Sequence, residues 1–90
     1  MTTKIAIAWL LEQDWPTWQK MDPQLPEYSR WLGKIEALET QARSRGLQGE
    51  RVIVNPEKFA KWCSANGREI GRDSRSLYAA QTLANRRTGH

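Results

Sequence analysis

Cysteine and histidine are nearly missing from this 90-residue sequence: it has one of each, and the histidine is the last residue. Cys63 alone cannot form an internal disulfide, which fits a reducing compartment, and we expect a cytoplasmic protein. One Cys and one terminal His cannot supply the ligands of a zinc site. The same shortage leaves a nucleophile without a histidine base on an ordered element. We therefore expect no metal and no cofactor, and we interpret Cys63 as a small core side chain.

Long hydrophobic runs are missing as well. The longest, residues 5–11 (IAIAWLL), is far shorter than the roughly 18 residues of a membrane span. Polar residues 12–14 follow it in place of the small residues of a signal-peptide cleavage site. We therefore expect neither a span nor a signal peptide. The β-branched Ile5 and Ile7 favour a buried strand, with a buried helical segment as the alternative.

Catalytic and phosphate-binding motifs are also lacking. Neither the G-x-x-x-x-G-K-[ST] loop nor the G-x-G-x-x-G fingerprint occurs. Glu36 and Glu39 stand three residues apart, yet a solvated helix side explains them more simply. Asp14, Asp22 and Asp73 each fit a cap or a turn. We predict no catalytic residue and expect that the protein is not an enzyme.

Charge, in contrast, is plentiful and uneven. Residues 1–40 hold four basic and six acidic side chains, giving −2, and residues 41–90 hold ten basic and four acidic, giving +6. A basic half attracts nucleic acid or other polyanions. The side chains that would contact phosphates are Arg68, Arg72, Arg75, Arg86 and Arg87.

The best candidate for an anion site is the loop of residues 66–75, NGREIGRDSR. Gly67 and Gly71 allow a close backbone approach to a ligand, and the three arginines of the loop offer forked donors for phosphate. The loop also leads into a helix N-terminus, which favours an anion. Asp73 as the cap of that helix, and Glu69 among the arginines, favour a solvated loop instead. Both interpretations stay open at this point.

Helical spacing organises most of the remaining sequence. A short helix is expected from Trp15, capped by Asp14 and ended by Asp22-Pro23. A longer amphipathic helix follows Pro26 and ends at Gly46. Its expected core stripe is Tyr28, Trp31, Leu32, Ile35, Leu38 and Ala42.

The second half repeats this order. A turn is expected over residues 46–49, then a strand over residues 51–54, RVIV. Asn55 and Pro56 are typical of a helix start, and Asn66-Gly67 of its end. A last helix would begin at the cap Asp73, with Leu77, Ala80 and Ala84 on its apolar side and Tyr78 and Leu83 beside them.

These elements predict a small single α+β domain, residues 1–90, with about residues 1–3 and 86–90 frayed. The order is strand, helix, helix, strand, helix, helix: mostly helical with a short two-stranded sheet. Such a sheet has exposed edges, so we expect a homodimer that pairs through an edge strand.

Trp15 and Trp18 differ from the other tryptophans because they fall on a short helix bounded by prolines. We interpret them as a protein interface, since tryptophan is a common interface anchor. The sequence therefore favours a small, non-enzymatic interaction module that self-associates. The alternative is a nucleic-acid-binding protein that uses the arginine-rich second half.

Overall fold

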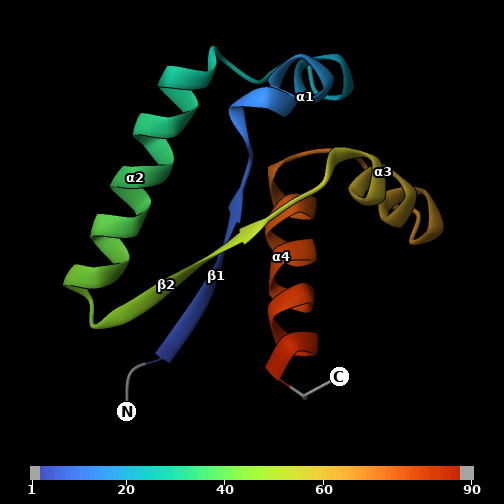
Figure 1. Cartoon of the computed structure of the whole chain (residues 1–90). Coiled ribbons are helices and arrows are strands. Elements are labelled where there is room, and N and C mark those ends of the chain that lie inside the picture. Colours follow the sequence, from blue (N-terminus) through green and yellow to red (C-terminus); the bar gives the residue numbers. More distant parts are fainter. Residues whose placement is uncertain (1–2, 88–90) are drawn as a thin grey trace.

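A computed structural model describes residues 3–87 of the chain. Within these residues, four α-helices and a parallel two-stranded sheet follow the expected order, which confirms the α+β prediction. The elements are β1 (Thr3–Trp9), a 3-10 turn η1 (Glu12–Asp14), α1 (Trp15–Met21), α2 (Tyr28–Ser44), β2 (Leu47–Ile53), α3 (Pro56–Ala65) and α4 (Arg72–Arg87) (Figure 1).

The two strands form the middle of three layers. β1 and β2 pair in parallel, from Thr3 opposite Leu47 to Trp9 opposite Ile53. Figure 1 shows the sheet between α2 and α4. α4 packs mainly on β1 and α2 mainly on β2. Because side chains alternate along a strand, Ala6 and Ala8 face α4, whereas Ile7 faces the other layer.

A second, larger core is aromatic and lies beyond the carboxyl ends of the strands. Trp9 and Trp31 meet edge to face at 5.6 Å between ring centroids. Trp18 and Phe59 are fully buried, with their rings 5.6 Å apart. Cys63, 2% exposed, belongs to the same cluster, as expected of a structural thiol.

Trp15 and Trp18 belong to this core, which corrects our interpretation of them as interface anchors. They are 6% and 0% exposed. Trp15 packs against Tyr28 at 5.0 Å and donates its indole N–H to the carbonyl of Pro26 at 3.1 Å. The short α1 can bury both rings because α2 and α3 supply the remaining sides of the cluster. The pair therefore leaves little surface for a partner.

Several element boundaries differ from our expectations. β2 begins at Leu47, inside the stretch where we expected a turn, since the turn is completed by Arg45 and Gly46, the latter with φ of 78°. Asp14 makes no side-chain capping bond to α1, whereas Asn55 caps α3 as expected by accepting from the N–H of Lys58 at 3.0 Å. α4 begins at Arg72, so Asp73 lies in its first turn, and the helix continues to Arg87.

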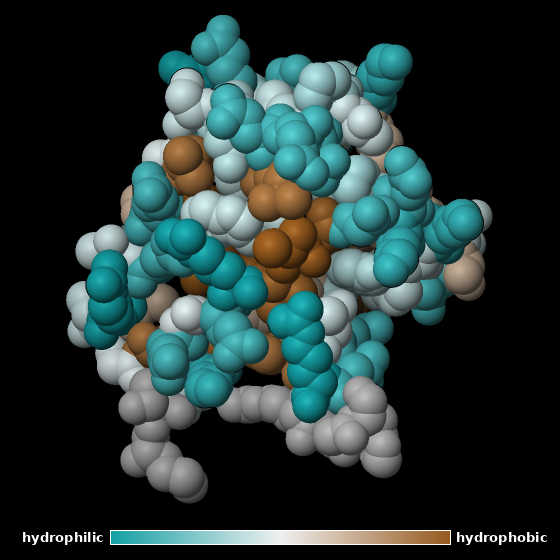
Figure 2. Space-filling model, in the orientation of Figure 1, coloured by the Kyte–Doolittle hydropathy of each residue, from teal (hydrophilic) through white to brown (hydrophobic). Residues whose placement is uncertain are grey.

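The face on which β2 lies in front of β1 has an apolar centre. Figure 2 shows hydrophobic side chains gathered there, with hydrophilic ones around them. Ile53, the last residue of β2, is 57% exposed. The carboxyl end of β2 is thus one of two places where the sheet presents apolar surface.

Candidate functional site

The other place is the free edge of β1. The N–H of Val54 donates to the carbonyl of Trp9 at 3.0 Å, so the backbone of Trp9 faces β2. Successive residues of an extended strand direct their N–H and C=O groups to opposite edges. Lys4, Ala6 and Ala8 therefore direct theirs away from β2. Among residues 3–87 the sheet has two strands only, so no strand pairs with this edge.

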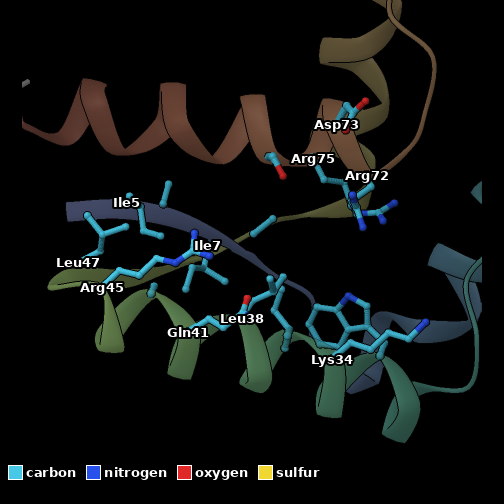
Figure 3. Close-up of a pocket in the computed structure, with 16 residues that line it drawn as sticks. Ile5, Ile7, Lys34, Leu38, Gln41, Arg45, Leu47, Arg72, Asp73 and Arg75 are labelled. Carbon is cyan, nitrogen blue, oxygen red and sulfur yellow. The ribbon is translucent and has the colours of Figure 1, made fainter. Parts of the chain in front are cut away.

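A cavity of about 500 Å³ lies along this edge, and we call it the β1 groove. Its floor is residues 5–8 of β1. One wall is α2, through Lys34, Leu38 and Arg45, and the other is the start of α4, through Arg72 and Ser76. Figure 3 shows β1 between the two helices, with Ile5 and Ile7 directed toward α2. A second hollow of about 530 Å³ continues from Lys4 to Ala6 along Ala80 and Ala84.

The α2 wall includes Lys34, Leu38, Gln41 and Arg45. These residues are three or four apart, so they form a row on one side of the helix. Leu38 belongs to this row and is 51% exposed, which corrects its prediction as core. α2 packs mainly on β2, so its side nearer β1 is left uncovered. α2 ends at Ser44 with Arg45 as its C-cap, because Gly46 adopts a positive φ, and this places Arg45 at one end of the groove.

The α4 wall is a row four residues apart: Arg72, Ser76, Ala80 and Ala84. All four are exposed, and three are small, which corrects the prediction that Ala80 and Ala84 face the core: Ala79 and Leu83 do so instead. Small side chains leave room beside β1 for another chain. The start of α4 is fixed by Arg75, which is 6% exposed and donates to Asp22 at 2.9 Å. This ion pair joins α4 to the end of α1.

The rim of the β1 groove is positively charged. Lys34, Arg45 and Arg72 are exposed, and none has an ion-pair partner in the described part of the chain. Asp73 is the one carboxylate of the lining. Figure 3 shows Arg72 reaching toward β1 and Asp73 directed away from it. The groove therefore combines an apolar floor, an unpaired strand edge and a cationic rim.

The predicted anion site is dispersed. Arg68 donates to the Ser74 hydroxyl at 3.2 Å, and Ser74 donates in turn to the Glu69 carbonyl at 2.6 Å. Arg75 donates a hydrogen bond to the carboxylate of Asp22 and so is not free for a ligand anion. Gly67, with φ of 62°, ends α3, and Gly71 accepts from the N–H of Arg75.

The remaining predicted arginines lie far from this loop. Arg86 is exposed near the other end of α4, some twenty ångströms from Arg72 at about 1.5 Å per residue. The side chain of Arg87 lies outside the described residues. The structure thus brings together Arg72 with Lys34 and Arg45, which our sequence reasoning did not single out.

Outside the groove, the pKa values of one thiol and one carboxyl group are shifted, and so is that of Arg51, which pairs with the carboxyl. Burial raises the pKa of the Cys63 thiol, although Arg68 and Ser74 oppose this. The hydrogen bonds from Arg51 lower the pKa of Glu39, and those bonds measure 2.7 and 3.0 Å. A buried thiol with a raised pKa is a poor nucleophile, so none of these groups points to chemistry here.

Metal and membrane features were searched over the same residues. In residues 3–87 no three His, Cys, Asp or Glu side chains gather at one place to hold a metal. None of the described helices combines the length and the apolarity needed to cross a membrane. Comparison of the chain with models of protein families, with curated proteins and with solved structures finds no match.

Proposed function

We propose that this protein is a non-enzymatic interaction module that takes up an extended segment of another protein along the free edge of β1. The observation that carries this proposal is the unpaired edge of β1 at the floor of a groove between two helices. The backbone groups of Ala6 and Ala8 would bond to the incoming strand, and the groove would receive its side chains. Strand addition of this kind is a common way to bind peptides.

Self-association through the same edge is the second candidate, and it keeps the expected homodimer. A two-fold axis at the edge of β1 would place α2 of the two copies side by side and antiparallel. Lys34 of one copy would then approach Arg45 of the other. Like charges brought together at an interface cost several kcal/mol. The cationic rim therefore favours a different partner over a second copy.

Binding of nucleic acid has less support. Arg68 and Arg75 are engaged within the chain, and Arg86 lies at the other end of α4 from Arg72. Affinity for duplex DNA should fall with salt with a log–log slope of about −0.9 per phosphate contacted, so a salt titration tests it directly. A cytoplasmic location remains our expectation from the single buried thiol.

Amide hydrogen exchange tests the proposal. The probe is a pool of short peptides with β-branched residues at alternate positions and the remaining positions randomised. We expect the pool to slow exchange at the amides of Ala6 and Ala8. The amides of Gly49 and Arg51 are the internal control, since by the same alternation they face the free edge of β2.

N-methylation of the best peptide then identifies strand addition. Two versions of the peptide are made, one methylated on its odd-numbered backbone nitrogens and one on its even-numbered ones. Only one of these two sets of N–H groups faces β1, so one version should lose binding and the other should keep it. Equal binding of both versions, or equal protection of the two sheet edges, would contradict the proposal. So would a lack of protection by any peptide.

A further inference from the structure

We infer that the segment bound in the β1 groove is acidic at two points about five residues apart, with uncharged side chains between them. This inference rests on the proposed function and names the chemistry of its partner. Its basis is the cationic rim, with Arg45 at one end of the groove and Lys34 with Arg72 at the other. In a protein segment, carboxylates are the groups that form charge-assisted hydrogen bonds with the lysine ammonium and the forked arginine guanidinium.

The spacing follows from α2. Residue numbers 34 and 45 are eleven apart, which is about 16 Å along a helix that rises 1.5 Å per residue. Figure 3 shows both side chains leaning the same way along α2, as helical side chains lean toward the N-terminus. Their charges are therefore about as far apart as their Cα atoms. An extended peptide rises about 3.3 Å per residue, so about five residues cover that distance.

The middle of the groove determines the residues between the acids. On the α2 side the incoming side chains meet Leu38, Ile7 and the edge of Ala42, which are apolar, and the uncharged amide of Gln41. On the α4 side they meet Ser76 and Ala80, which are small. Neither wall offers a charge there, so a charged side chain would lose solvent without gaining a partner. The segment is therefore uncharged between its two acidic residues, with apolar side chains where it meets Leu38 and Ile7.

A polyanion of evenly spaced phosphates does not fit this arrangement, because its charges would lie over the apolar middle. A second copy does not fit either, since its own β1 has no acidic residue to offer Lys34 and Arg45, and its Lys4 is paired with Glu50 at 3.6 Å. Charge complementarity thus favours a separate, acidic protein segment.

Three fluorescent peptides of equal length and composition test the spacing. Each carries two glutamates among valines and serines, separated by roughly two, five or eight residues. Fluorescence polarisation with the full chain should give the tightest binding at the middle spacing. The lysine analogue of that peptide should bind about tenfold or more weakly.

Charge exchange then places the contact in the groove. The double variant Lys34→Glu/Arg45→Glu should lose about tenfold or more in affinity for the glutamate peptide and bind the lysine analogue better than the original chain does. Lys58→Glu/Lys61→Glu is the matched control, because both residues are exposed on α3 and outside the groove. It should change neither affinity. All four residues are exposed, and circular dichroism verifies that both double variants fold.

The outcomes separate the two proposals. Equal binding of the glutamate peptide and its lysine analogue, with Ala6 and Ala8 protected in both complexes, overturns the acidic partner and leaves strand addition standing. Binding that the Lys58→Glu/Lys61→Glu control weakens as much as the groove variant also overturns it. No protection at Ala6 and Ala8 by any peptide overturns the proposed function itself. A dimer in light scattering whose Ala6 and Ala8 amides are protected without any peptide shows that a second copy occupies the groove, and it overturns the acidic partner.

Discussion

The free edge of β1 lies at the floor of a groove between α2 and α4, whereas the free edge of β2 carries a charged residue of its own. The middle of β1 reads IAIAW and contains no charge, whereas Arg51 of β2 lies on its free edge and Glu50 pairs with Lys4 of β1 at 3.6 Å. Arg51 is held by Glu39 of α2 and lies 3.8 Å above the Trp9 ring. Charged side chains at an edge oppose pairing with another chain.

The two edges also differ in what fixes the helix beside them. On the β1 side, the buried pair of Arg75 and Asp22 holds the start of α4. On the β2 side, the Arg51–Glu39 pair joins the sheet to α2, and the Arg51 side chain is half exposed. Burial makes the first pair the stronger determinant of structure, because breaking it leaves a charge without solvent. The free edge of β1 is thus unpaired and lies beside a helix that a buried ion pair holds in place. The free edge of β2 carries charge and lies beside a helix that a partly exposed ion pair holds.

Removing Arg75 should have the largest effect on this contrast. Arg75→Ala leaves Asp22 largely buried without its partner, and we expect a loss of about 3–5 kcal/mol in the free energy of unfolding by urea. The exposed Arg86→Ala on the same helix is the control and should change stability by less than about 0.5 kcal/mol. Amides at the β1 edge should also exchange faster in Arg75→Ala than those at the β2 edge. Equal stability of the two variants would contradict the role of this pair.

Gly49→Ala should have the next largest effect. A Cβ on Gly49 would lie 2.5 Å from Cδ1 of Ile7, the far end of a flexible side chain, so Ile7 must leave its present rotamer, at about 1 kcal/mol. Ile7→Val removes that Cδ1 atom and should recover part of the loss in the double variant. Gly33→Ala is the control: it lies within α2 with nothing inside 4 Å of its Cβ, and it should gain up to about 1 kcal/mol. Thermal unfolding measures all four chains, and similar losses in both glycine variants would count against the close contact.

The Glu39–Arg51 pair should give a smaller, pH-dependent effect. Because the pKa of Glu39 is lowered in the folded chain, its carboxylate stabilises the fold above the ordinary value of 4.5. That contribution is lost as the pH falls below 4.5 and through the lower folded pKa. The difference in Tm between the original chain and Glu39→Gln should therefore shrink between about pH 7 and about pH 3. Glu69→Gln, an exposed carboxylate without an ion pair in the described chain, should alter Tm little; a constant gap for Glu39→Gln would refute the assignment.

Local signals in the sequence were sufficient for the order of elements. Asn55 and Pro56 start α3 as expected, and Gly46 and Gly67 mark the ends of α2 and α3 with positive φ. The extent of β2 was not predictable in this way. Its first residues, LQGE, have little strand propensity, and they become a strand because seven residues of β1 lie opposite seven of β2.

The candidate site was beyond prediction for a related reason. Lys34 and Arg45 are ordinary helix-surface residues until α2 packs on β2 and leaves them beside β1. Trp15 and Trp18 looked exposed because α1 is short, but residues from α2 and α3 complete their burial. One signal in the sequence could have indicated the groove. The apolar stripe of α2 has six residues, more than a two-stranded sheet can bury, so part of the stripe had to remain exposed.

Leu38 is the stripe position left over, and replacing it should have the smallest effect on stability. Leu38→Ser removes a side chain that is 51% exposed, so we expect a change within about 0.5 kcal/mol in urea unfolding. Leu32→Ser, on the same helix, is the matched comparison and should cost about 1–2 kcal/mol, because Leu32 packs against the aromatic core. Peptide binding in the groove should show the opposite order, with the Leu38 variant weakened more. Equal stability losses would mean that Leu38 is core after all, and an undiminished affinity would remove it from the α2 wall as a contact for the bound segment.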